Sequence, residues 1–146
     1  MALDLRAPGA FATGHLRLAP LWLAIGAAMV CAVVAASLVS IPASAAFVLH
    51  DKAVHLAVYG GLTGWFAQVF RHDLARLGLL VGFVALGVGV EYLQGLTPSR
   101  RFEVLDMVAN ASGALLAWAL SYTRAGEVLP AVERLLGVSA PTVHGR

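Results

Sequence analysis

The stretch PLWLAIGAAMVCAVVAASLVSI, at residues 20–41, holds no charged side chain. An α-helix rises about 1.5 Å per residue, so a helix of this length crosses the roughly 30 Å hydrocarbon core of a bilayer. Pro42 ends the stretch, and Ala43-Ser44-Ala45 after it resembles the cleavage site of a secretory signal peptide. The apolar run is longer than the roughly 7–15 residues of a signal-peptide core, which favours a retained membrane helix.

The composition of the whole chain is typical of a membrane protein. Of the 146 residues, 60% are hydrophobic and 12% are charged, against about 25% charged residues in soluble domains. The net charge of +2 is small and the basic residues are scattered, which argues against nucleic-acid binding. Cys31 is the single cysteine, so an intrachain disulfide is excluded.

Three more apolar segments, at residues 53–70, 77–96 and 104–122, are predicted to be membrane helices. The expected fold class is therefore all-α, an integral membrane bundle of about four transmembrane helices. The expected regions are a cytoplasmic N-terminal segment at 1–19, the four-helix membrane domain at 20–122, and a cytoplasmic tail at 123–146 with a short interfacial helix and a disordered end.

Pairs of small residues one helical turn apart allow two helices to approach closely in lipid. The chain has such pairs at Gly60 and Gly64, Gly78 and Gly82, and Gly113 and Ala117. The alternative is that glycine is simply common in transmembrane helices. The sequence leaves both interpretations open.

The distribution of basic residues predicts the orientation. Four spans would leave Lys52, Arg100 and Arg101 on one side of the membrane and most arginines on the other. The positive-inside rule then places both termini in the cytoplasm, as in a multi-pass protein of the cell's inner (plasma) membrane. The arginines on the cytoplasmic side are Arg6, Arg17, Arg71, Arg76, Arg124, Arg134 and Arg146.

Polar side chains interrupt the later spans at helical spacing. A charged group near the centre of a bilayer costs roughly 2.5–3.5 kcal/mol, so such residues usually face the interior of a bundle. The predicted topology brings all of them to the same outward end, where Asp51 is also placed to cap the second helix. The stripes are Asp51, His55 and Tyr59 on the second span, Glu91 and Gln94 on the third, and Asp106 and Asn110 on the fourth.

These residues suggest three kinds of role. Arg100 and Arg101 suit binding of an anionic, lipid-linked ligand, because guanidinium groups pair with phosphate or carboxylate. His55 and Glu91 are candidate catalytic residues for acid–base chemistry, which leaves open whether the protein is an enzyme. Ion pairs that only hold the helices together are the structural alternative. The candidate binding residues are Asp51, Lys52, His55, Tyr59, Glu91, Gln94, Arg100, Arg101, Asp106 and Asn110.

A metal site built from His55, Glu91 and Asp106 is a weaker hypothesis, because a single histidine is a poor start for zinc. The sequence contains neither H-E-x-x-H nor G-x-S-x-G, so it predicts neither a zinc hydrolase nor a serine hydrolase. We therefore expect no metal and no cofactor.

The ordered set of motifs resembles the VanZ-like family of bacterial membrane proteins. The resemblance rests on D-K-x-x-H-x-x-x-Y at 51–59, E-x-x-Q at 91–94 and P-S-R-R-x-E-x-x-D-x-x-x-N-x-x-G at 98–113. It covers roughly residues 51–120. It implies a multi-span α-helical protein of the cell envelope, associated with lowered sensitivity to the glycopeptide teicoplanin. The expected function is to engage a lipid-linked cell-wall precursor or another envelope substrate in the membrane.

Overall fold

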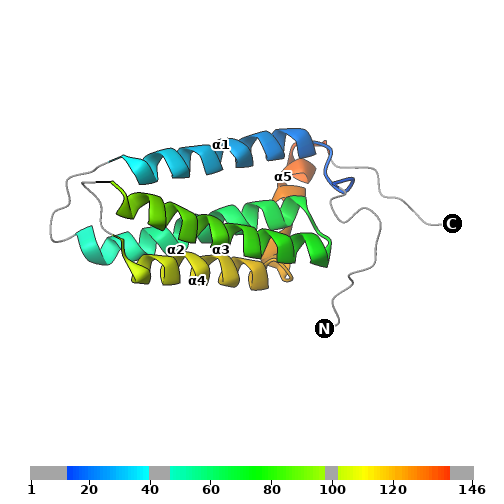
Figure 1. Ribbon diagram of the computed structural model, residues 1–146. Helices are drawn as coiled ribbons and strands as arrows, with labels where there is room; N and C mark the ends of the chain where they lie inside the picture. Colours follow the sequence, from blue (N-terminus) through cyan, green and yellow to red (C-terminus); the bar gives the residue numbers. More distant parts are fainter. Residues whose placement is uncertain (1–12, 40–46, 98–101, 139–146) are drawn as a thin grey trace.

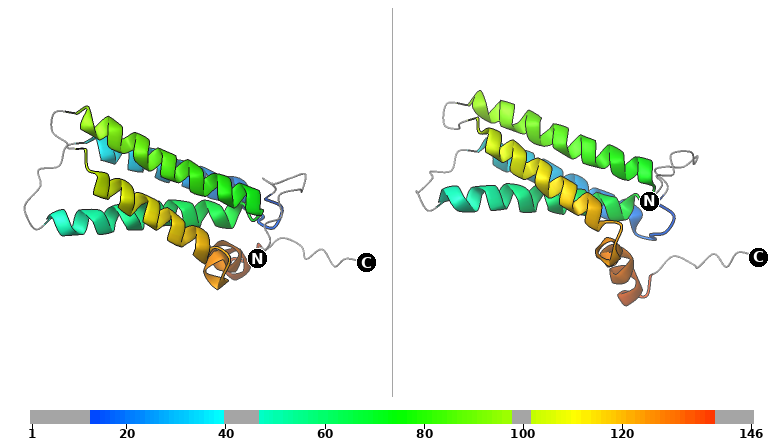
Figure 2. Two further views of the ribbon diagram at one scale, coloured as in Figure 1. Left: turned by 60° about the horizontal axis from the view of Figure 1, so that its bottom comes forward. Right: turned by 90° about the horizontal axis from the view of Figure 1, so that it is seen from below.

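The computed structural model describes residues 13–39, 47–97 and 102–138, and none of these residues lies in a β-strand. The all-α fold class is therefore confirmed. Four longer helices run side by side, and a short helical segment lies across one end of them (Figures 1 and 2). The elements are α1 (Ala19–Leu38), α2 (Phe47–Val69), α3 (Asp73–Gly95), α4 (Val104–Leu120), the 3₁₀ helix η1 (Arg124–Glu127) and α5 (Val128–Leu135).

Two of these helices, α1 and α3, are long and apolar enough to cross a membrane. A third candidate arises only if α4 and the η1–α5 segment, which are bent by 80° relative to each other, are taken as one broken span. Helix α4 alone has 17 residues, and α2 carries the charged and amide side chains of its polar stripe. The bundle is thus confirmed as helical with two or three candidate spans, whereas four spans are not confirmed.

The distribution of side chains in the bundle is inverted relative to a soluble protein. Large apolar side chains cover much of the outside, as at Val81, Leu105 and Leu116, while Glu91 and Asn110 are buried within it. Water would disfavour such a surface, whereas lipid tails solvate it. The bundle is therefore suited to a membrane.

Small residues set the distance between α2 and α4, which pack against each other more extensively than any other pair of elements. A Cβ atom at Gly113 would collide with the Leu56 carbonyl and would lie 3.0 Å from the Gly60 nitrogen. One turn further along, Gly64 faces Ala117. A packing role is therefore correct for these two pairs. No described atom of another element lies within 4 Å of a Cβ built at Gly78 or Gly82, so that pair makes no helix contact within the bundle.

Glu133 of α5 caps the N-terminus of α1. Its carboxylate accepts hydrogen bonds of 2.8 Å from the backbone N–H groups of Arg17 and Leu18 and from Trp22 Nε1. Burial by itself raises the pKa of Glu133, but these three donors outweigh it, so the pKa lies below the ordinary glutamate value of 4.5. The two backbone N–H groups belong to the residues that lead into α1, and an anion at the N-terminus of a helix matches the helix dipole. α5 is therefore docked onto the bundle by a buried contact.

Further buried polar contacts hold this end of the bundle together. The side-chain Oε1 of Gln68 accepts a hydrogen bond from the backbone N–H of Leu129, and the backbone carbonyl of Gln68 accepts one from His15 Nε2, both at 2.8 Å. Burial lowers the pKa of His15, against the raising effect of that hydrogen bond. Arg76 Nε donates to the Ala67 carbonyl at 3.1 Å. These contacts lie at the end of the bundle opposite to the polar stripes.

Candidate functional site

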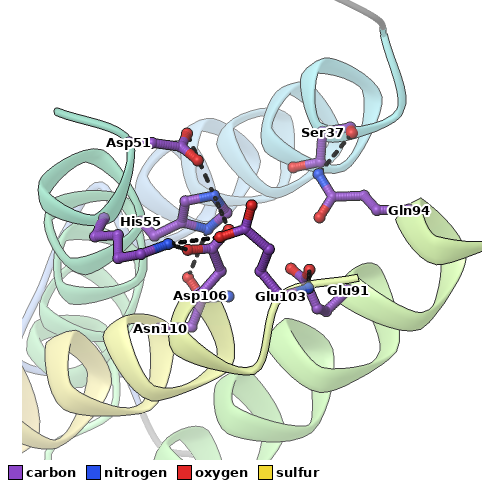
Figure 3. Close-up of polar contacts among 9 residues, drawn as sticks. Ser37, Asp51, His55, Glu91, Gln94, Glu103, Asp106 and Asn110 are labelled. Atoms are coloured by element: carbon purple, nitrogen blue, oxygen red, sulfur yellow. Dashed lines mark hydrogen bonds and ion pairs between the residues drawn. The ribbon is translucent and has the colours of Figure 1, made fainter. Parts of the chain in front are cut away.

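Polar side chains from three helices meet at the end of the bundle where α2 begins, α3 ends and α4 begins (Figure 3). The helical spacing in the sequence placed each stripe on one helix face, and packing turns these faces toward one another. We call this group the polar cluster. It consists of Asp51, Lys52, His55, Glu91, Glu103, Asp106 and Asn110.

Lys52 joins α2 to the start of α4. Its Nζ donates to Asp106 Oδ1 at 2.5 Å and to Glu103 Oε2 at 2.9 Å. The Asp106 side chain is nearly buried, while those of Lys52 and Glu103 are partly exposed. At the rim of the cluster, the single positive charge of Lys52 is therefore shared between the negative charges of two carboxylates.

His55 lies deeper, between Lys52 and the bundle interior. Its Nδ1 is 3.0 Å from the side-chain oxygen of Asn110. Because that oxygen only accepts, the contact assigns a proton to Nδ1. The other ring nitrogen, Nε2, lies 3.7 Å from Asp51 Oδ1 and 3.8 Å from Asp106 Oδ2. The imidazole is thus oriented by an amide on one side and faces two carboxylates on the other.

Glu91 borders the cluster on the α3 side, and its side chain is almost fully buried. Its Oε1 accepts a hydrogen bond of 2.6 Å from the backbone N–H of Glu103, while Oε2 has no partner among the described residues. Burying a carboxylate oxygen without a partner is unfavourable, so most buried polar atoms in folded proteins have one. Glu91 therefore has one oxygen available for a ligand or a proton.

Two predicted site residues lie apart from these contacts. Gln94 turns toward α1 and donates from Nε2 to the Ser37 carbonyl at 2.8 Å, so it connects α3 to α1. Tyr59 is buried one turn beyond His55, and its hydroxyl has no partner among the described residues. Arg100 and Arg101 lie outside the described residues.

The structure also changes the role of Asp51 and adds one residue to the site. Asp51 does not cap α2, because that helix already begins at Phe47. Asp51 lies instead one turn before His55, on the same face. Glu103, which the sequence analysis did not include among the candidates, binds Lys52 through its side chain and Glu91 through its backbone. The available signal was its place in the charged motif that leads into the fourth predicted helix, three residues before Asp106; the structure makes it the N-cap residue of α4.

Three residues of the cluster are placed to act together as metal ligands, and they are not the same three that the sequence suggests. Asp51, His55 and Asp106 each offer one ligand atom, and these three atoms all lie within 4.8 Å of one another. Glu91, which the sequence analysis had combined with His55 and Asp106, instead accepts the backbone hydrogen bond described above. Asp51 takes its place because it lies one turn before His55 on α2.

Comparison with known proteins gives one partial match. The chain is 37% identical over 76 residues to an uncharacterized protein of the fission yeast Schizosaccharomyces pombe. The match covers 50% of this chain and 47% of that protein, so the chain spans about half the length of the curated relative. No family model matches the sequence, and no solved structure matches it.

These comparisons overturn the resemblance to the VanZ-like family. The motifs at 51–59, 91–94 and 98–113 are matched by no family model, and the curated relative comes from a eukaryote. The expectations that depended on that resemblance, a bacterial envelope protein and a link to teicoplanin, are withdrawn with it. Short, widely spaced polar motifs arise readily wherever helices turn polar faces toward one another, which explains why the pattern was misleading.

Proposed function

We propose that this chain is a multi-pass membrane protein whose polar cluster binds the headgroup of an amphipathic, lipid-linked ligand. The observation that carries the proposal is the burial of Glu91 Oε2 with no partner among the described residues, within a cluster of ionisable groups at one end of an apolar bundle. A purely structural set of ion pairs would satisfy its buried members. A site that binds a ligand instead keeps hydrogen-bonding capacity for it.

Four spans fit this proposal better than three. Helices α1 to α4 run side by side, and α5 bends away from α4 by 80° and caps α1 with Glu133. With α4 as the fourth span, the polar cluster lies near one membrane face and the Glu133 cap near the other. A headgroup at the first face would reach the cluster while its lipid tail stays among the exposed apolar side chains.

The orientation of this topology is also part of the proposal, with the cluster on the extracytoplasmic side. A Cys31→Ala background with a new cysteine at Thr97 tests it in intact cells. We expect a membrane-impermeant maleimide to label Thr97→Cys, because that residue follows α3 at the cluster end. A cysteine at Thr123, near the opposite end, serves as the matched control. Labelling of position 123 alone would reverse the orientation.

The binding experiment uses the full chain in lipid nanodiscs and a radiolabelled polyprenyl diphosphate, with the uncharged polyprenol as competitor. We expect Lys52→Gln to weaken binding about tenfold, since a hydrogen bond from the ammonium group to the charged diphosphate contributes about 1.5–3 kcal/mol. Glu91→Ala should weaken binding as well, because Glu91 can contact a phosphate oxygen only by donating a proton through Oε2, and alanine removes that donor. Glu127→Gln is the matched control, because this exposed carboxylate pairs with Arg71 at the opposite end.

Thermal unfolding of each variant separates loss of binding from loss of folding. Equal binding by wild type and all variants would refute the proposal. Loss of folding in Glu91→Ala and Lys52→Gln, with binding unchanged in the folded fraction, would instead establish the cluster as structural. Competition by the uncharged polyprenol as strong as that by the diphosphate would show that the tail alone is recognised.

An enzyme is the second candidate, and the geometry of His55 favours it. With Nδ1 donating to Asn110, Nε2 is left as a proton acceptor, and the buried Glu91 Oε2 has no partner in the part of the chain that the structure describes. In this case His55→Ala would retain binding of the diphosphate but abolish its turnover, measured as release of labelled phosphate. Turnover that survives in folded His55→Ala would exclude this residue as the catalytic base.

A further inference from the structure

Three side chains of the polar cluster surround one point in space. His55 Nε2 lies 3.7 Å from Asp51 Oδ1 and 3.8 Å from Asp106 Oδ2, and the three ligand atoms all lie within 4.8 Å of one another. Bonds of about 2.0–2.2 Å to a common ion bring ligand atoms to about 3–3.5 Å from one another. Small side-chain rotations would therefore bring the three atoms into contact with one ion.

Asn110 gives His55 the protonation that a metal ligand needs. Its oxygen accepts from Nδ1, so a neutral imidazole carries its lone pair on Nε2, toward the two carboxylates. Histidines that bind metals almost always donate their other ring N–H to a carbonyl or carboxylate in this way. A lone pair beside two carboxylate oxygens is electrostatically unfavourable unless a cation lies among them.

Among the described residues at this end of the bundle, carboxylates outnumber cationic side chains. Among the described residues there, Lys52 is the single lysine or arginine, and it binds Glu103 and only one oxygen of Asp106. The other Asp106 oxygen and Asp51 face His55 instead. The carboxylates of the cluster therefore outnumber its ammonium group.

Two buried oxygens have no partner among the described residues, namely Glu91 Oε2 at the α3 side of the cluster and the Tyr59 hydroxyl one turn beyond His55 on α2. Their residues are 1% and 2% exposed. The Tyr59 ring lies against the same stretch of α3 as the Asn110 amide, at Gly87. Water molecules in the shell of a bound ion would give these oxygens the partners that buried polar atoms normally have.

From these observations we infer that Asp51, His55 and Asp106 bind a divalent transition-metal ion of the Zn²⁺ or Mn²⁺ type. One imidazole and two carboxylates form a mixed set of donors, because imidazole suits zinc and carboxylates suit manganese. Three protein ligands leave coordination positions for water or for a ligand. Lys52 competes with the ion, since its ammonium holds the second Asp106 oxygen. The inference does not depend on the lipid-linked ligand proposed above.

Titration of the metal-stripped full chain in detergent with Mn²⁺, followed by the electron paramagnetic resonance of the free ion, tests the site. We expect wild type to bind one Mn²⁺ per chain and Zn²⁺ to displace it. Asp51→Asn and His55→Gln should each weaken Mn²⁺ binding about tenfold or more. Lys52→Gln should strengthen it about tenfold, because a positive charge near the ion is removed.

Glu127→Gln, the acidic control at the opposite end, should bind Mn²⁺ as wild type does. Thermal unfolding with and without the ion checks folding, because an ion bound only by the native state raises the melting temperature of wild type and not of His55→Gln. Absence of stoichiometric binding to wild type would overturn the inference. Binding that Asp51→Asn and His55→Gln leave unchanged would overturn it as well.

Discussion

Replacement of Gly113 by alanine tests the contact that brings the polar cluster together. The glycine lies on α4 where α2 crosses it, and a Cβ atom there would lie 2.9 Å from the Leu56 carbonyl carbon and still closer to its oxygen. Both atoms belong to the backbone of a helix, so no side-chain rotation relieves the collision. The two helices must instead move apart.

The expected loss of stability follows from two opposing effects. Overpacking of a tight contact costs about 3 kcal/mol at the upper end of the usual range, which is appropriate for a collision with backbone. Alanine in a helix interior is better than glycine by about 1 kcal/mol. The net destabilisation is therefore about 2 kcal/mol, which lowers the melting temperature by about 6–8 °C for a chain of this length.

Gly78→Ala is the matched control, because it has the same gain in helix propensity but no described atom of another element within 4 Å of the new Cβ. We expect its melting temperature to equal or exceed that of wild type. Tryptophan fluorescence during heating in detergent measures both variants.

Separation of α2 from α4 should also draw His55 away from Asn110, so Gly113→Ala should weaken Mn²⁺ and diphosphate binding. Equal stability of the two variants would refute the close crossing of α2 and α4.

Three further predictions concern the contacts that hold α1. Glu133→Ala should destabilise the protein by about 3 kcal/mol, because three buried donors lose a charged acceptor. Glu133→Gln keeps one acceptor oxygen and should lose less stability. Thermal unfolding measures both variants. The pKa of Glu133 is lowered in the folded state, so its contribution to stability is complete above pH 4.5 and is lost as the pH falls through the folded pKa. The melting temperature of wild type should therefore fall more steeply than that of Glu133→Gln below about pH 4.5. Parallel curves for the two proteins would contradict this prediction. Gln94→Leu removes the hydrogen bond from α3 to the Ser37 carbonyl and should lower the free energy of unfolding by about 0.6 kcal/mol, the average for such contacts in membranes. A destabilisation as large as that of Glu133→Ala would show that Gln94 has a larger role.

The family resemblance illustrates a limit of short motifs. Residues such as Asp51, His55 and Asp106 are expected at helical spacing wherever a membrane helix turns a polar face inward, so their order alone does not identify a family. The physical part of the same observation, that these faces meet at one end of the bundle, does not depend on the family. It agrees with the contacts that the structure shows between α2 and α4.

The sequence by itself determined the features that depend on local order. The uncharged run at residues 20–41 predicted α1, the apolar composition predicted an all-α bundle, and the spacing of Asp51, His55 and Asp106 placed each on a definite helix face. Hydropathy and helical periodicity are properties of neighbouring residues, so they can be read without knowing the fold.

Only the tertiary structure decided which groups are partners. Lys52 binds Asp106 across 54 positions, and Glu133 caps α1 across 116 positions. Asp51 rather than Glu91 joins His55 and Asp106, while Gln94 turns away to α1. These outcomes depend on the rotation of each helix about its axis and on the separation that glycine permits between α2 and α4. A few degrees of rotation exchange one polar neighbour for another without changing the hydrophobic pattern of any helix.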